Sequence, residues 1–110
     1  MPESFERGAL TEAVYYVLLS LFEPNHGYGI MQQVEEMSGG RVKLGAGTLY
    51  GALNSLVAKK WIKLLNEYGG TRKKEYIITD VGRAAVLAEV ERLKELAANG
   101  ERVVEKLNQV

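Results

Sequence analysis

The sequence predicts a mainly α-helical fold with a small β-hairpin, and three stretches of the chain support this prediction. Leucines recur at spacings of three and four in residues 49–56, which puts them on one face of a helix. Two strand-like runs follow, at residues 61–68 and 74–79, and a basic turn that contains glycine joins them. Apolar residues then repeat every three or four positions across residues 86–107, which predicts one long C-terminal helix.

A helix followed by a strand, a basic turn and a second strand is the element order of a winged helix-turn-helix module. We therefore expect residues 47–60 to form the recognition helix of such a module and residues 69–74 to form its wing. The predicted division places a winged-helix DNA-binding domain at residues 1–79 and a C-terminal dimerisation helix at residues 80–110.

The first two helices are predicted from apolar stripes and from the residues that end them. A stripe at residues 8–23 predicts the first helix, which Pro24 ends. A glycine-rich turn at residues 25–29 precedes the second helix, which glycines at residues 39–40 end. His26, the only histidine, could sense pH or bind a metal ion, but a loop or helix-capping role is the better interpretation because no second ligand is evident.

The remaining elements complete the predicted fold around the hairpin. Residues 41–44 are expected to form a short strand that closes the small sheet. Trp61 directly follows the recognition helix and is expected to pack in the core. Tyr50 could either pack in the core or contact a phosphate group. Thr79 is a good N-cap for the last helix.

The composition indicates one globular domain without cysteine. The chain has 110 residues, of which 46% are hydrophobic, and the absence of cysteine excludes disulfide bonds and thiolate zinc sites. Its longest mainly apolar run, at residues 13–22, is too short to span a bilayer, and we expect a cytoplasmic protein. We find no nucleophile–base pair, metal-binding cluster or paired carboxylates, and therefore expect no enzyme activity, no cofactor and no metal site.

Positive charge is concentrated in the middle of the chain, although the formal net charge is zero. Residues 41–74 contain eight basic residues and one acidic residue, whereas the rest of the chain contains six basic and thirteen acidic residues. This segregation predicts a basic face for the phosphates of a nucleic acid. The alternative is that the basic residues cluster by chance on solvated loops.

The outer face of the predicted recognition helix carries small, polar or basic side chains and no acidic one, so this face could approach DNA closely. We expect its polar positions to read the groove, and Asn54 could make a paired contact to adenine. The lysines at its end and the wing are expected to contact phosphates. The candidate DNA-binding residues are Thr48, Tyr50, Gly51, Asn54, Ser55, Lys59, Lys60, Arg72, Lys73 and Lys74.

The long C-terminal helix is predicted to join two copies of the chain. With about 28 residues and a length of about 42 Å, it cannot bury its whole apolar seam on a domain this small. The alternative is that the helix folds back on its own domain. Asn99 and Gly100 are weak helix formers and could mark a bend, or a close approach that only glycine permits. The candidate dimer-interface residues are Val86, Val90, Leu93, Ala97, Gly100, Val104 and Leu107.

In several motifs the sequence resembles the PadR family of bacterial transcriptional regulators. The shared motifs are Gly47-Thr48-Leu49-Tyr50 followed by Ala52-Leu53 and Leu56, then Trp61-Ile62, a basic turn, Tyr76 and Ile78-Thr79-Asp80-Val81-Gly82-Arg83, with His26-Gly27-Tyr28-Gly29-Ile30 before the second helix. The single C-terminal helix resembles the short branch of the family. The resemblance implies a homodimer whose winged helices bind a palindromic operator in double-stranded DNA and which represses a neighbouring transporter or detoxification gene.

The resemblance also implies a small hydrophobic effector at the dimer interface that releases the repressor from DNA. Members that trap flat drugs tend to carry a tryptophan on the last helix, whereas this chain has Leu93 and Ala97 there, which leaves open an aliphatic pocket or no effector. The family often has proline at the position of Gly51 and basic residues at the positions of Asn54 and Ser55. The alternative function is a winged-helix protein–protein interaction module without sequence-specific DNA binding.

Overall fold

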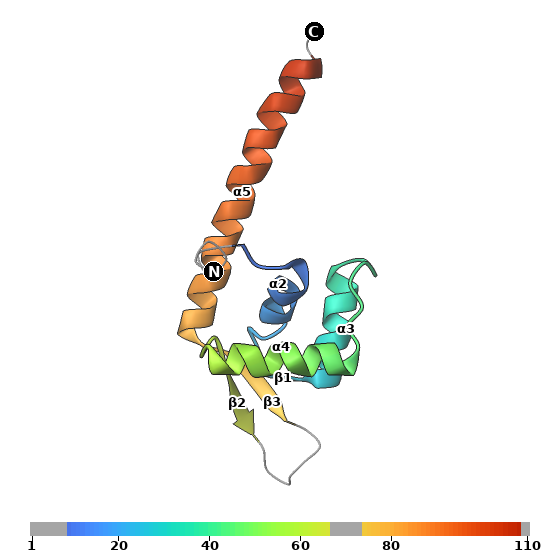
Figure 1. The fold of residues 1–110 in the computed structure, drawn as a ribbon, viewed down its shortest axis with the longest axis vertical. Coiled ribbons are helices and arrows are strands. Elements are labelled where there is room, and N and C mark those ends of the chain that lie inside the picture. Colours follow the sequence, from blue (N-terminus) through green and yellow to red (C-terminus); the bar gives the residue numbers. More distant parts are fainter. Residues whose placement is uncertain (1–8, 67–73, 109–110) are drawn as a thin grey trace.

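The computed structural model of the chain describes residues 9–66 and 74–108. Four helices and a small sheet make up this part of the chain (Figure 1), which confirms the predicted fold class. The helices are α2 (Glu12–Leu19), α3 (Gly27–Met37), α4 (Ala46–Ala58) and α5 (Asp80–Asn108), and the strands are β1 (Asn25–His26), β2 (Ile62–Asn66) and β3 (Glu75–Ile78).

The sheet is antiparallel and has three strands in the order β1-β3-β2. Ile62 of β2 lies opposite Ile78 of β3, and both side chains are buried. The third strand is β1, because Asn25 pairs with Tyr76. The predicted strand at residues 41–44 is therefore wrong.

A side-chain hydrogen bond explains why residues 41–44 stay outside the sheet. The hydroxyl of Ser38, at the end of α3, accepts a hydrogen bond from the backbone N–H of Val42 at 2.9 Å. Val42 and Leu44 are half-buried and pack against the core. The segment thus connects α3 to α4 as a loop that is fixed by its side chains.

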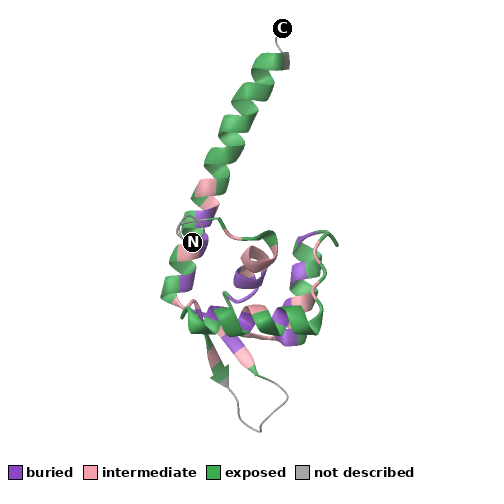
Figure 2. Cartoon of the chain, in the orientation of Figure 1, coloured by how far each residue is buried: buried purple, intermediate pink, exposed green. Residues whose placement is uncertain are grey.

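The core lies between α2, α3, α4 and the sheet, with the first turns of α5 closing it (Figure 2). The leucine stripe predicted for α4 is confirmed, since all three of its leucines are buried. The buried hydrophobic residues are Val17, Leu18, Leu21, Ile30, Val34, Leu49, Leu53, Leu56, Ile62, Tyr76, Ile78 and Val86.

Local hydrogen bonds set where the first two helices begin. Thr11 caps α2, because its hydroxyl accepts from the backbone N–H of Val14 at 3.1 Å, so this helix begins later than predicted. His26 caps α3 with its ring Nδ1, which accepts from the backbone N–H of Gly29 at 3.4 Å. The capping role predicted for the histidine is confirmed.

Helix α5 projects far beyond the rest of the subunit, as Figure 1 shows. Its 29 residues give the subunit an elongated shape, with principal extents of 64 × 30 × 23 Å. The helix runs without interruption through Asn99 and Gly100, and a Cβ atom built on Gly100 would meet nothing within 4 Å, so no close approach requires glycine there. Thr79 caps it as predicted, because its hydroxyl accepts from the backbone N–H of Gly82 at 3.1 Å. No helix in the described part of the chain is both long and apolar enough to cross a membrane.

Candidate nucleic-acid interface

The outer face of α4 is exposed along the whole helix. All five candidate DNA-binding residues within this helix lie on the surface: Thr48, Tyr50, Gly51, Asn54 and Ser55. A Cβ atom built on Gly51 would meet nothing within 4 Å, so the backbone is uncovered at this position. Few long side chains stand out from this face and none of its side chains is negatively charged, so a flat or grooved partner could approach it closely.

Tyr50 connects α4 to the start of α3. A Cβ atom on Gly27 would lie 2.2 Å from the Tyr50 hydroxyl oxygen, so only glycine lets the two helices approach this closely. The tyrosine is still 42% exposed. Its packing against α3 is thus compatible with a phosphate contact by the exposed part of the ring and hydroxyl.

The C-terminal end of α4 is held in an unusual backbone conformation. Lys60 has a φ of 66°, in the left-handed region that residues other than glycine rarely adopt. Its backbone N–H donates a hydrogen bond to the carbonyl oxygen of Val57 at 2.9 Å. The backbone N–H of Trp61 donates to the carbonyl oxygen of Leu56 at 3.0 Å. This pair of hydrogen bonds is a Schellman motif, which ends the helix at a defined point. Lys59 and Lys60 are both exposed at this end.

The Lys59 side chain packs against the ring of Trp61, which follows α4. Its Nζ lies 5.1 Å from the ring centroid of Trp61, within the range of a cation–π interaction. Trp61 itself is half-buried and packs against the core, in agreement with the prediction. The ammonium group of Lys59 therefore lies against an apolar surface.

Acidic residues neutralise part of the predicted basic stretch. Arg41 forms an ion pair with Glu12 of α2, and Lys43 lies 3.9 Å from the carboxylate of Glu35 on α3. Lys74 is exposed directly before β3. The candidate wing residues Arg72 and Lys73 lie outside the described residues, together with the rest of residues 67–73. The described positive charge next to α4 thus comes mainly from lysines.

Tyr28 is a surface residue that the sequence analysis did not select. It occupies the first turn of α3, is 64% exposed, and its hydroxyl accepts a weak 3.5 Å hydrogen bond from the Gln32 amide. The neighbouring Gly27 contacts Tyr50, so this turn adjoins the exposed face of α4. The sequence feature that could have indicated an exposed residue here is the position of Tyr28 between two glycines.

The perturbed titratable groups of the described chain lie on α5, away from the face of α4. Glu89 is only 3% exposed, and its carboxylate accepts from the Arg92 guanidinium at 2.6 and 2.9 Å. These hydrogen bonds, with one from the backbone N–H of Leu10, hold the pKa of Glu89 below its usual range. Within residues 9–66 and 74–108, no group of three His, Asp or Glu side chains could hold a metal ion.

The apolar seam of α5 is divided between two surroundings. Val86 is 3% exposed and belongs to the core of its own subunit, so the prediction that it lies in a dimer interface is wrong. Val90 is half-buried against the same core. Beyond this point the seam faces solvent, and its exposed residues are Leu93, Ala97, Gly100, Val104 and Leu107. Leu96 and Val103 are exposed nearby at 52% and 63%, and they widen the apolar stripe.

Comparison with known proteins identifies one family. The sequence model of the transcriptional regulator PadR-like family matches residues 16–88. An uncharacterized 37.1 kDa protein in transposon TN4556 of Streptomyces fradiae is 38% identical over 87 residues, which cover 78% of this chain and 24% of that protein. The chain thus spans about a quarter of the length of this curated relative.

Solved structures share the fold over most of the chain. A PadR family transcriptional regulator from Eggerthella lenta has a TM-score of 0.62 at 26% identity, over 79% of this chain and 71% of that one. A transcriptional regulator from Clostridium thermocellum has a TM-score of 0.61 at 20% identity, over 87% and 90% of the two chains. A conserved protein of unknown function, considered a potential transcriptional factor, reaches 0.71 at 21% identity over 94% and 96%.

Proposed function

This chain belongs to the transcriptional regulator PadR-like family, and we propose that it is a homodimeric repressor that binds a palindromic operator in double-stranded DNA. Members of the family are DNA-binding transcriptional regulators and not enzymes. The repressor would control a neighbouring transporter or detoxification gene. It would act in the cytoplasm.

The exposed face of α4 is the observation that carries this proposal. A helix fits the major groove of B-DNA, where the base edges can be read by hydrogen bonds. Thr48, Asn54 and Ser55 offer hydroxyl and amide groups for that purpose, and all three are exposed. Gly51, which has open space around it, would let the helix backbone come close to the bases.

Phosphate contacts would fix the position of α4 in the groove. Lys59 and Lys60 lie at its C-terminal end, and Tyr50 presents its hydroxyl beside the start of α3. The predicted wing cations Arg72, Lys73 and Lys74 would add contacts to the DNA backbone. Contacts of this kind carry no sequence information, but they provide much of the affinity.

The exposed second half of α5 supports the proposed dimer. A stripe that includes Leu93, Val104 and Leu107 lies in solvent in the single subunit, which is costly unless another surface covers it. We propose that residues 80–110 form the dimerisation helix and residues 1–79 the DNA-binding domain. A dimer would present two α4 helices to half-sites about 34–36 Å apart.

A small hydrophobic effector at the dimer interface would act through the same helices. Because α5 is fixed to the end of α4 through Thr79, a shift of the two α5 helices against each other would change the spacing of the two α4 helices. The operator would then no longer match both reading helices at once.

A mobility-shift titration against the DNA upstream of the gene tests the proposal. The wild type should bind with a steep dependence on salt concentration. Replacing Arg72, Lys73 and Lys74 together with alanine should flatten the slope of log K against log salt. The expected change is about 0.9 for each phosphate that the variant no longer neutralises.

A matched triple variant separates local from general charge effects. Changing Lys94, Arg102 and Lys106 on α5 to alanine removes the same charge, and these residues lie on the projecting helix. It should leave the salt slope nearly unchanged. Absence of affinity for the upstream DNA at low salt would contradict DNA binding and favour the alternative of a protein–protein interaction module.

A further inference from the structure

The exposed side chains of α4 restrict which bases this helix can read. The exposed residues of the helix are Ala46, Gly47, Thr48, Tyr50, Gly51, Asn54, Ser55, Val57 and Ala58. They include no arginine, lysine, glutamine, histidine or acidic residue. Arginine and lysine pair with the O6 and N7 atoms of guanine, and acidic residues accept a hydrogen bond from cytosine. The helix therefore lacks the groups that read a G·C base pair most strongly.

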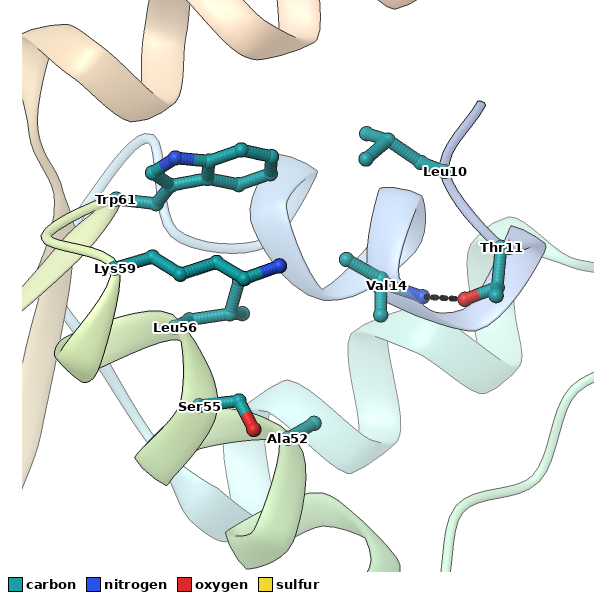
Figure 3. A pocket seen from close by; sticks show the side chains of 8 residues that line it. All are labelled: Leu10, Thr11, Val14, Ala52, Ser55, Leu56, Lys59 and Trp61. Atoms are coloured by element: carbon teal, nitrogen blue, oxygen red, sulfur yellow. Dashed lines mark hydrogen bonds between the residues drawn. The ribbon is translucent and has the colours of Figure 1, made fainter. Parts of the chain in front are cut away.

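The lysine that follows α4 does not supply the missing group. Lys59 and Ser55 line a cavity of about 530 Å³ between α2, α4 and Trp61 (Figure 3). The Nζ atom of Lys59 lies 5.1 Å from the centroid of the Trp61 ring. Because Asn54 and Lys59 are five positions apart, they point in directions about 140° apart around the helix axis. Lys59 thus extends toward α2 and away from the side of the helix that carries Asn54.

Asn54 presents the amide group of this helix to solvent. In the described part of the chain, its side chain makes no hydrogen bond, whereas the amides of Asn25 and Gln33 bond to each other at 2.8 Å. A carboxamide has two donors and one acceptor. It can donate to N7 of adenine and accept from the N6 amino group of the same base. The Asn54 amide is therefore available for a paired contact to adenine.

The surface around Asn54 is uncharged and uncrowded. Its neighbours three and four positions away on the helix are Tyr50, Gly51, Val57 and Ala58, and all four are exposed. A Cβ atom built on Gly51 would meet nothing within 4 Å. The methyl groups of Val57 and Ala58 suit contact with the C5-methyl group of thymine. The residues around the amide thus favour the same kind of base pair as the amide itself.

We propose that each operator half-site contains an A·T base pair whose adenine is bound by the Asn54 amide. The methyl group of a thymine in an adjacent base pair packs against Val57 and Ala58. This inference rests on the proposed function, because it names the bases that α4 reads. Phosphate contacts add affinity without sequence information. Discrimination between A·T and G·C at this position therefore depends on one side chain.

Selection of bound sequences from a library of random duplex DNA tests the proposed base. The wild-type chain should enrich half-sites in which one base pair is always A·T. Asn54→Ala should lose the preference at that position and keep the others. Asn54→Arg should replace the A·T pair with G·C there, because arginine pairs with guanine. Ser55→Ala, which changes a neighbouring polar residue on the side toward the cavity, is the matched control and should retain the A·T pair.

A modified base identifies the atoms that are in contact. 7-Deazaadenine lacks the N7 acceptor but still pairs with thymine. In place of the selected adenine, it should weaken binding by the wild type about five- to tenfold and should not affect binding by Asn54→Ala. The same replacement at an adenine outside the half-sites is the control. Asn54 is exposed, so its variants should keep the wild-type melting temperature, which circular dichroism measures.

The outcomes separate this inference from the proposed function. Selected half-sites that Asn54→Ala leaves unchanged would overturn the inference alone, and so would an equal effect of 7-deazaadenine on the wild type and on Asn54→Ala. Failure of the wild type to enrich any duplex from the library would contradict the proposed function, together with the inference that rests on it.

Discussion

The hydroxyl of Thr79 lies 2.7 Å from the backbone carbonyl oxygen of Lys60 and donates a hydrogen bond to it. The same hydroxyl accepts from the backbone N–H of Gly82, and the N–H of Thr79 donates to the carbonyl of Trp61 at 2.9 Å. One threonine thus joins the end of α4, the start of β2 and the start of α5. These hydrogen bonds connect α4 directly to α5.

Removing the hydroxyl at this junction should weaken the fold. Thr79→Ala loses both the N-cap of α5 and the bond to Lys60, and we expect a loss of about 1–2 kcal/mol in the free energy of unfolding. Thr79→Ser keeps the hydroxyl and should lose much less. Urea unfolding of the two variants measures the difference, and equal stabilities would show that the hydroxyl bonds are unimportant.

Gly82 should be sensitive to a single added methyl group. A Cβ atom at this position would lie 2.2 Å from the backbone carbonyl oxygen of Trp61, which cannot move without disturbing β2. We expect Gly82→Ala to lower the melting temperature, although alanine is favoured over glycine by about 1 kcal/mol in an unobstructed helix.

Gly51→Ala is the matched control for this effect. A Cβ atom on Gly51 meets nothing within 4 Å, so the gain in helix propensity should raise the melting temperature. Thermal unfolding followed by circular dichroism compares the two glycine variants. Shifts in the same direction would contradict the close approach of α5 to Trp61.

The exposed seam of α5 should determine the oligomeric state. Leu93→Asp combined with Val104→Asp places two charges on the exposed stripe, and the protein should become monomeric in light scattering, because burying unpaired charges is costly. Val81→Asp with Leu87→Asp is the control. These residues are 56% and 65% exposed and lie outside the seam, so the mass should remain that of the wild type. A double seam variant of unchanged mass would remove the proposed interface.

Glu89 should make stability depend on acid pH. The pKa of Glu89 is lowered in the folded chain, mainly by its hydrogen bonds with Arg92. The ionised carboxylate therefore adds to the free energy of unfolding at pH values above the ordinary carboxyl pKa of about 4.3. This stabilisation is lost as the pH falls through the lower pKa of the folded chain. Glu89→Gln should be less stable at neutral pH and should lose less stability on acidification. Urea unfolding in neutral and acidic buffers compares it with Glu91→Gln, an exposed control; parallel curves for the wild type and Glu89→Gln would contradict the assignment.

Elements with strong local signals could be predicted from the sequence. The leucine spacing of α4 and the heptad pattern of α5 are periodic over several turns. The two strands of the hairpin are separated in the sequence by residues typical of turns, including two glycines. β1 could not be predicted, because it has two residues and exists only through pairing with β3, about 50 positions later. Residues 41–44 look like a strand locally, but the hydroxyl of Ser38 binds their backbone.

The sequence predicted the exposed face of α4 correctly, but it predicted the distribution of positive charge around that helix less well. The exposed face of α4 follows from the position of its buried leucines, since the two faces of one helix determine each other. The ion pairs of Arg41 and Lys43 form with α2 and α3, so counting charges along the chain overestimated the basic surface. No sequence pattern connects Leu10 to Trp61, and the cavity between them exists only in three dimensions.

Two helices of this subunit stop with the same backbone geometry but different residues. At the end of α3 the left-handed position is Gly39, with a φ of 65°, and at the end of α4 it is Lys60, with a φ of 66°. An L-residue with a side chain is less favourable there by roughly 1–2 kcal/mol. Glycine in place of Lys60 would therefore stabilise the fold, but it would remove one of the cations that we propose to contact DNA.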